Sequence, residues 1–163
     1  LNEVAREVIA LSMSRLQREH VVLRTEFASG LTPFAGDRVQ LQQVILNLFL
    51  NAADAMSEVE DRPRQLVIKT EPEKDDRVRL TVQDTGVSFD PRDAERLFEM
   101  FYTTKSNGMG IGLPVSRAII ENHQGRLWAA PNDGPGATFS FSIPCRPEIT
   151  RGLERPGASA IAH

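Results

Sequence analysis

The chain has 163 residues, of which 25% are charged and 40% are hydrophobic, and its formal net charge at pH 7 is −3. This length and composition are typical of one globular domain that can bury a core of its own. The slightly acidic balance argues against a nucleic-acid-binding surface, which is ordinarily basic. The single cysteine, Cys145, excludes a disulfide within the chain.

The hydrophobic pattern predicts a helix, a strand and a loop over residues 1–36. Residues 21–27 alternate apolar and polar side chains, as a strand does, and the glycines and prolines after them indicate a loop. The helix covers residues 2–19, begins with Asn2 as its cap and has an apolar face made by Val4, Val8, Leu11 and Leu16.

The strongest helical pattern covers residues 37–58. This helix is apolar on more than one side, because Leu46 and Leu50 lie off the main face, and such a helix is usually buried. The main face consists of Leu41, Val44, Ile45, Leu48, Ala52, Ala55 and Met56.

Strands and short helices are predicted for the rest of the chain. The strands lie at 65–70, 77–83, 125–130 and 137–143, a short helix at 93–99, and a further helix between an irregular stretch and residue 123. The sum is an α/β two-layer sandwich, a mixed and mostly antiparallel sheet of about five strands covered on one face by about three helices. Residues 1–145 form this domain, and 146–163, which lack an apolar pattern, form a disordered tail or linker.

Polar side chains recur along one flank of the helix predicted at 37–58. Asn47, Asn51 and Asp54 stand there at helical spacing. Amides on so apolar a helix need hydrogen-bond partners. Either they bind neighbouring backbone groups or they face a polar ligand, since an Asn oxygen can coordinate Mg²⁺. The residues alone leave both interpretations open.

The sequence Asp84-Thr85-Gly86 follows a predicted strand. A carboxylate only accepts hydrogen bonds, so it could bind the amine of adenine and would repel the oxygen that guanine carries at that position. An ordinary Asp-Thr-Gly turn without a ligand is the alternative.

A glycine-rich stretch runs from Gly108 to Gly112 into a predicted helix, shortly after Lys105. Glycines let backbone N–H groups approach a phosphate, the helix N-terminus adds positive potential, and a lysine can meet the phosphate charge. The stretch lacks the Lys-Ser/Thr pair of the Walker pattern.

Two phenylalanines, Phe98 and Phe101, stand three residues apart just before the glycine-rich stretch. They make an apolar face that suits either plain core packing or the anchoring of a mobile lid.

Together and in this order, these segments resemble the catalytic domain of bacterial sensor histidine kinases, with its Bergerat-type ATP-binding fold. The resemblance covers roughly residues 1–144, and its wording is closest to PAS-linked oxygen- and nodulation-type sensor kinases. Residues 43–56 are similar to the N box, 84–89 to the G1 box, 97–105 to the F box, 108–113 to the G2 box, and 136–139 to the last Gly-x-Thr-x-Phe element.

The resemblance implies a role for individual residues. It implies that Asn51 binds Mg²⁺, that Asp84 reads adenine with the support of the Thr138 hydroxyl, and that Asn47 and Lys105 are catalytic. Phe98 and Phe101 would seat the lid. The full implied ATP-binding set is Asn47, Asn51, Asp84, Gly86, Ser88, Phe98, Phe101, Thr103, Thr104, Lys105, Gly108, Met109, Gly110, Ile111, Gly112, Leu113 and Thr138.

Two positions depart from the family pattern. Ser88 stands where the G1 box usually has a second glycine, which puts the affinity for ATP in question. Asp54 stands where many relatives carry a basic residue, so it cannot give the positive phosphate contact that is sometimes made there.

The resemblance also indicates which reaction to expect. Related ATPases carry a water-activating Glu in the N box, whereas the matching position here is Asn47, and an amide cannot serve as a general base. We therefore expect transfer of the γ-phosphoryl group of Mg-ATP to a histidine. The alternatives are an ATPase or serine kinase of the same fold, and a degenerate, nucleotide-independent interaction module.

The implied partners lie outside the chain. None of the three histidines, His20, His123 and His163, stands in the usual acceptor motif, so we expect the acceptor on a separate dimerisation domain. The fragment is expected to be monomeric and cytoplasmic, and its parent to be a homodimer, soluble or membrane-anchored, that serves a response regulator receiver domain. Deletion of residues 1–19, whose helix would contact the dimerisation domain, is expected to leave ATP binding largely intact.

Overall fold

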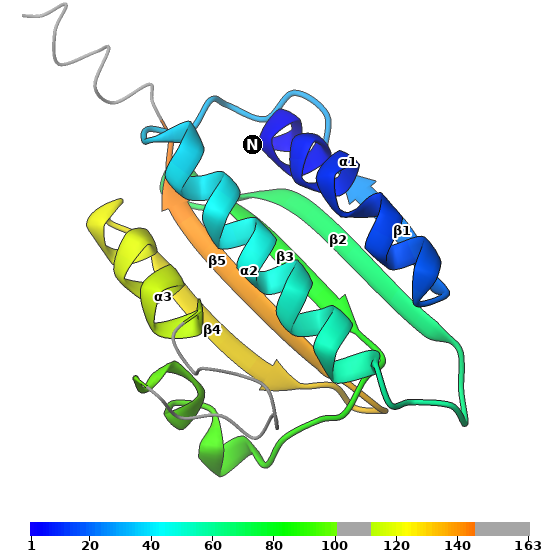
Figure 1. Ribbon diagram of the computed structural model, residues 1–163. Helices are drawn as coiled ribbons and strands as arrows, with labels where there is room; N and C mark the ends of the chain where they lie inside the picture. Colours follow the sequence, from blue (N-terminus) through cyan, green and yellow to red (C-terminus); the bar gives the residue numbers. More distant parts are fainter. Residues whose placement is uncertain (101–111, 146–163) are drawn as a thin grey trace, which may run out of the picture.

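In the computed structural model, which describes residues 1–100 and 112–145, three helices cover one face of a sheet (Figure 1). The helices are α1 (Asn2–Arg18), α2 (Arg38–Met56) and α3 (Gly112–Asn122). The strands are β1 (Val21–Phe27), β2 (Arg64–Glu73), β3 (Arg77–Asp84), β4 (Arg126–Pro131) and β5 (Ala137–Pro144). The two-layer sandwich predicted from the sequence is confirmed.

The sheet has the strand order β1-β2-β3-β5-β4. Only β1 and β2 pair in parallel, and the other neighbours are antiparallel, as expected of a mixed, mostly antiparallel sheet. The hairpin between β2 and β3 turns through Asp75 and Asp76, whose φ angles of 63° and 55° are left-handed, a conformation that Asp tolerates better than most residues. In the β3–β5 register Gln83 faces Thr138, so the end of β3 lies beside the start of β5.

Helix α2 is the centre of the core. It begins after Asp37, whose carboxylate accepts hydrogen bonds from the backbone N–H groups of Val39 and Gln40. Phe49 is buried at 1% exposure although the predicted apolar face omitted it, whereas Ala55 is only partly buried. The wide apolar surface of α2 is therefore real, and it rests on β3 and β5 through the alternating inward side chains of those strands.

Helix α1 is an integral part of the same core. Val4, Val8 and Leu16 are at most 2% exposed, but Leu11 is 74% exposed, so its predicted place on the apolar face is wrong. The predicted cap is also wrong: the helix is preceded by Leu1, and the Asn2 amide instead donates to the carbonyl oxygen of Ala28 at 2.8 Å. An apolar residue every third or fourth position fits several faces of a long helix, and tertiary packing selects one of them.

The predicted short helix at 93–99 is replaced by two 3₁₀ turns, η1 (Pro91–Asp93) and η2 (Arg96–Phe98). Their backbone bonds span three residues, as between the Phe98 N–H and the Glu95 carbonyl at 3.2 Å. Segments this short cannot build the repeated bonds that make an α-helix favourable.

The face of the sheet opposite the helices carries polar and charged side chains. Trp128 of β4, the only tryptophan of the sequence, lies on this face. The guanidinium groups of Arg126 and Arg79 stand 4.9 and 5.9 Å from its ring centre. Burying one face and leaving the other polar is the ordinary pattern of an antiparallel sheet.

The described part of the chain ends at the buried Cys145, which forms an isolated bridge with Phe34. The predicted tail at 146–163 lies outside the described residues. Within residues 1–100 and 112–145, no helix combines the length and the apolar character needed to cross a bilayer.

Candidate functional site

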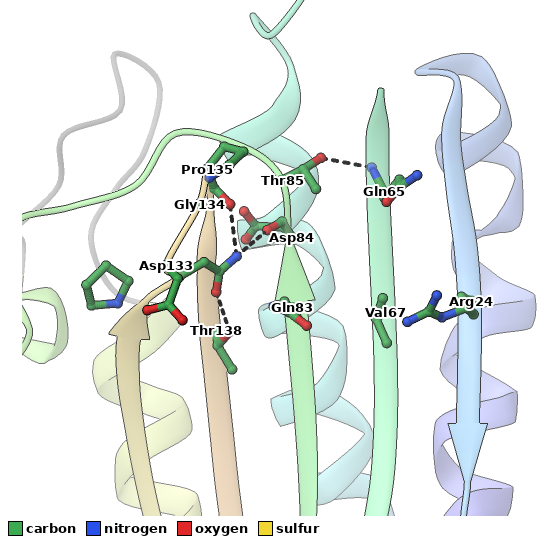
Figure 2. Close-up of a pocket in the computed structure, with 12 residues that line it drawn as sticks. Arg24, Gln65, Val67, Gln83, Asp84, Thr85, Asp133, Gly134, Pro135 and Thr138 are labelled. Carbon is green, nitrogen blue, oxygen red and sulfur yellow. Dashed lines mark hydrogen bonds between the residues drawn. The ribbon is translucent and has the colours of Figure 1, made fainter. Parts of the chain in front are cut away.

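The carboxylate of Asp84 marks the end of β3, beneath the C-terminal half of α2 (Figure 2). It is 1% exposed and follows Leu80 and Val82 in pointing toward the helices. Its Oδ1 accepts hydrogen bonds from the backbone N–H of Gly86 at 2.9 Å and from that of Ala137 at 3.3 Å. A carboxylate with backbone donors on one oxygen is held in a single orientation and keeps its acceptor character.

Only glycine fits at position 86, because the turn after β3 passes very close to α2. A Cβ at this position would lie 2.4 Å from the Ala55 carbonyl oxygen, which no side chain tolerates. The same carbonyl accepts a hydrogen bond from the Val87 N–H at 2.9 Å. The turn after β3 is therefore tied to the last turns of α2, the helix that carries the two asparagines.

The turn between β4 and β5 closes over the other side of Asp84. Gly136 has a φ of 93°, and a Cβ there would lie 2.0 Å from the Asp84 carbonyl oxygen. The Asn132 amide donates to that oxygen at 2.9 Å and to the Pro135 carbonyl at 3.0 Å (Figure 2). Sequence reasoning missed Asn132, because one asparagine in a Pro/Gly-rich turn carries no distinctive pattern.

Asn47 joins α2 to the first turn of α3. Its amide nitrogen donates to the Gly112 carbonyl at 3.3 Å and to the Ser116 hydroxyl at 3.0 Å. Asn51 lies one turn further along α2 and is partly buried. Asp54 is mostly exposed and pairs with Arg15 of α1 at 2.7 Å, so Asn47 and Asp54 of the predicted flank bond to different helices.

Phe98 of η2 is packed into the core rather than left as a free anchor. It is 6% exposed and meets Phe139 of β5 edge-on at 6.5 Å between ring centres. The Arg117 guanidinium of α3 lies 4.5 Å from the Phe98 ring centre and also pairs with Glu95 at 2.9 Å. Core packing is therefore confirmed for Phe98, and the anchoring of a lid stays a prediction because residues 101–111 lie outside the described part of the chain.

Residues 36–147 match the model of the family described as histidine kinase-, DNA gyrase B- and HSP90-like ATPase. The chain belongs to this family. Within it, the chain is an ATP-binding catalytic domain of the sensor histidine kinase type, as the relatives described next show.

The sensor protein FixL of Bradyrhizobium diazoefficiens is 42% identical over 91% of this chain and 29% of its own length. The solved catalytic domain of histidine kinase ThkA is 33% identical, with a TM-score of 0.79 over 91% of this chain and 94% of that one. ThkA in complex with the response regulator TrrA is 30% identical, with a TM-score of 0.76 over 91% of this chain and 41% of that one. The chain thus spans less than a third of the length of FixL.

One predicted site residue of this kinase domain lies on the wrong side of the sheet. Ala137 and Phe139 point toward the helices, so strand alternation turns Thr138 to the opposite face. Its hydroxyl donates to the Asn132 Oδ1 at 2.6 Å, in a shallow hollow lined by Gln83, Gln65 and others (Figure 2). The expected support of adenine by Thr138 is at odds with this placement, and the neighbour of the Asp84 carboxylate on β5 is Ala137.

The other members of the predicted set divide into two groups. Ser88 is exposed, and Gly112 and Leu113 begin α3 next to Asn47. The predicted residues that lie outside the described part of the chain are Phe101, Thr103, Thr104, Lys105, Gly108, Met109, Gly110 and Ile111.

Proposed function

We propose that this domain binds Mg-ATP at a site that includes the Asp84 carboxylate and donates the γ-phosphoryl group to a histidine of a separate dimerisation domain. The observation that carries the proposal is the buried Asp84 carboxylate, held by the Gly86 and Ala137 N–H groups at the end of β3. The turn that follows it is bonded to Ala55 of α2, the helix that bears Asn47 and Asn51, and the start of α3 is linked to Asn47. These elements carry residues that the family resemblance assigns to ATP binding.

Asp84 gives the proposed site its preference for adenine. A carboxylate accepts several hydrogen bonds at once, so it can take the adenine amine in addition to its backbone donors. Guanine offers an oxygen to the same place, and two acceptors facing each other in a dry site repel. The expected discrimination is about 10- to 100-fold, the size of one hydrogen bond to a charged group.

The side chains near the proposed site suit a metal ion that binds together with the nucleotide. Among the described residues no group of three His, Cys, Asp or Glu side chains could hold a metal. Mg²⁺ usually takes few protein oxygens together with substrate phosphates and water, and the amide oxygen of Asn51 would be such a ligand. When bound, Mg²⁺ would neutralise charge on the phosphates.

Asn47 supports transfer rather than hydrolysis. Its amide cannot accept a proton from water, and its nitrogen is engaged with Gly112 and Ser116 of α3. In the proposal Asn47 holds the start of α3 in place, and Lys105 meets phosphate charge. The domain thus positions the phosphoryl group and leaves the nucleophile to its partner.

The histidines of the chain support an acceptor elsewhere. His123 is buried; its Nε2 accepts a hydrogen bond from the Asp37 N–H at 2.9 Å and its Nδ1 meets the Ile119 carbonyl at 2.8 Å. Both ring nitrogens are therefore occupied. His20 is exposed but lacks the acceptor motif, and His163 lies outside the described residues.

The proposal extends to the whole protein. The solved complex of ThkA with TrrA supports a response regulator as the next acceptor. We propose a homodimeric parent with this domain in the cytoplasm, where its nucleotide is available.

Calorimetric titration with a non-hydrolysable ATP analogue, with and without Mg²⁺, tests the site. We expect Mg²⁺-enhanced binding by the wild type and a loss of about 10- to 100-fold in Asp84→Asn, because the amide presents a donor to the adenine amine. Asp133→Asn removes the same charge from the exposed β4–β5 turn and serves as the control.

Absence of binding by the wild type would refute the proposal and favour the interaction module. Incubation with labelled ATP distinguishes a histidine kinase domain from an ATPase. For the kinase domain we expect neither phosphohistidine on the isolated chain nor rapid release of phosphate. Fast turnover without an added acceptor would favour an ATPase instead.

A further inference from the structure

Arg62 lies in the loop between α2 and β2, outside every motif that the sequence suggests. Its Nε donates to the Thr85 carbonyl and its Nη2 to the Gly86 carbonyl, both at 2.8 Å. The side chain is only 29% exposed, and its remaining Nη1 pairs with Asp61 at 3.2 Å. Arg62 therefore donates hydrogen bonds to two successive carbonyl groups of the turn that follows Asp84.

Those two carbonyls belong to the peptide groups that hold the site together. The peptide with the Thr85 carbonyl carries the Gly86 N–H, which donates to the Asp84 carboxylate at 2.9 Å. The peptide with the Gly86 carbonyl carries the Val87 N–H, which donates to the Ala55 carbonyl of α2 at 2.9 Å. Each planar peptide is thus fixed at both ends, by Arg62 on its oxygen and by a site group on its N–H.

We propose that Arg62 is a positioning residue for adenine recognition, acting on Asp84 through these two peptide groups; this inference rests on the proposed function. With Arg62 in place, the Gly86 N–H is directed at the carboxylate and the turn is held against α2. A cation on the carbonyl oxygen also polarises the peptide and strengthens the bond that its N–H donates. Without Arg62, each of the two peptides keeps only the bond made by its N–H, so the Gly86 N–H is less firmly directed at the carboxylate, which the Ala137 N–H still holds.

The shape of the guanidinium group is essential to this role. Its planar fork places two N–H donors on neighbouring oxygens at once, whereas a lysine ammonium is a point charge on a flexible chain. Lysine can therefore keep the charge near the turn but cannot hold both carbonyls in the same way.

Arg64 provides a matched control two residues away. It also donates to three backbone carbonyls, of Val59 at 3.0 Å, Glu19 at 2.7 Å and Ser57 at 2.9 Å. None of these belongs to the turn after Asp84. Arg64 is the first residue of β2, so its loss removes a similar set of arginine–carbonyl hydrogen bonds close to Arg62 without removing a bond to that turn.

The test compares Arg62→Ala, Arg62→Lys and Arg64→Ala by titration with non-hydrolysable ATP and GTP analogues, with thermal unfolding followed by circular dichroism. We expect Arg62→Ala to lose about tenfold in ATP affinity and to lower the ATP-over-GTP preference by a similar factor. Arg62→Lys should recover only part of both. Arg64→Ala should unfold at a lower temperature but keep the affinity within about threefold of the wild type.

An Arg62→Ala variant that is less stable yet binds both analogues as the wild type does would overturn the inference, because the clamp would then serve stability alone. If that variant does not fold, Arg62→Lys decides: an unchanged affinity and preference in the folded lysine variant would equally overturn it. A wild type that binds neither analogue refutes the proposed function itself, so the two failures are distinguishable.

Discussion

Thr138 illustrates what a single residue's position in a motif can and cannot predict. The Gly-x-Thr-x-Phe resemblance located the residues that approach Asp84, since Gly136 and Ala137 both touch it. It did not give the direction of each side chain, because a shift of one residue along a strand reverses the face. Asp84 could be predicted because the argument required only that it stand at the end of a strand. Its burial agrees with its proposed role in binding adenine.

We expect Thr138→Val to leave the affinity for an ATP analogue within about twofold of the wild type, because its hydroxyl contacts Asn132 on the opposite face of the sheet from the Asp84 carboxylate. Calorimetric titration beside Asp84→Asn gives the comparison. A loss as large as that of Asp84→Asn would show that Thr138 acts at the nucleotide site after all.

Among the elements, α2 was predicted most fully because its signals agree with one another. A wide apolar face and polar residues at helical spacing indicate the same helix, and the structure adds the capping Asp37 that the sequence prediction did not name. The segment 91–98 was predicted less well, because nothing local distinguishes one turn of α-helix from two 3₁₀ turns. The Arg62 clamp could not be predicted at all, since it joins a loop to a turn 23 and 24 residues away.

The cap at the start of α2 should contribute to the stability of the domain. Asp37→Ala removes the side chain that accepts from the Val39 and Gln40 N–H groups, and should lower the free energy of unfolding by about 1 kcal/mol. Chemical denaturation followed by circular dichroism measures the loss. Asp90→Ala, which uncaps only the three-residue turn η1, should change the stability much less; equal losses would contradict the central role given to α2.

At the scale of the whole molecule, the fold class could be predicted because the strands and helices keep their separate periodicities along the chain. The contribution of α1 could not be predicted, because an amphipathic helix fits both a partner and the domain's own core. Arg64 binds the Glu19 carbonyl at the end of α1, and the side chains of Val4, Val8 and Leu16 in that helix are almost fully buried. The expectation that residues 1–19 are dispensable for ATP binding therefore changes.

We now expect deletion of residues 1–19 to unfold the domain and to abolish ATP binding with it. Exposing Val4, Val8 and Leu16 together costs roughly 5–9 kcal/mol, comparable with the whole stability of a domain this size. Circular dichroism and nucleotide titration of the shortened chain test this. Removal of residues 148–163, which lie within the predicted tail or linker at 146–163, is the matched truncation and should change neither the unfolding transition nor the affinity for nucleotide. A chain that begins at residue 20, unfolds cooperatively and binds ATP would contradict the expectation.

The position of Trp128 has a practical consequence for all of these measurements. Its indole ring lies near the guanidinium groups of Arg79 and Arg126, on the face of the sheet opposite the Asp84 carboxylate and the helices. When the domain unfolds, the ring loses its contact with the two arginines and becomes exposed to water, so its fluorescence emission should shift to longer wavelength. Filling of the nucleotide site on the other face should leave that emission nearly unchanged. We therefore expect Trp128 fluorescence to report unfolding with little response to nucleotide, so that stability can be followed in the same sample in which calorimetry measures affinity.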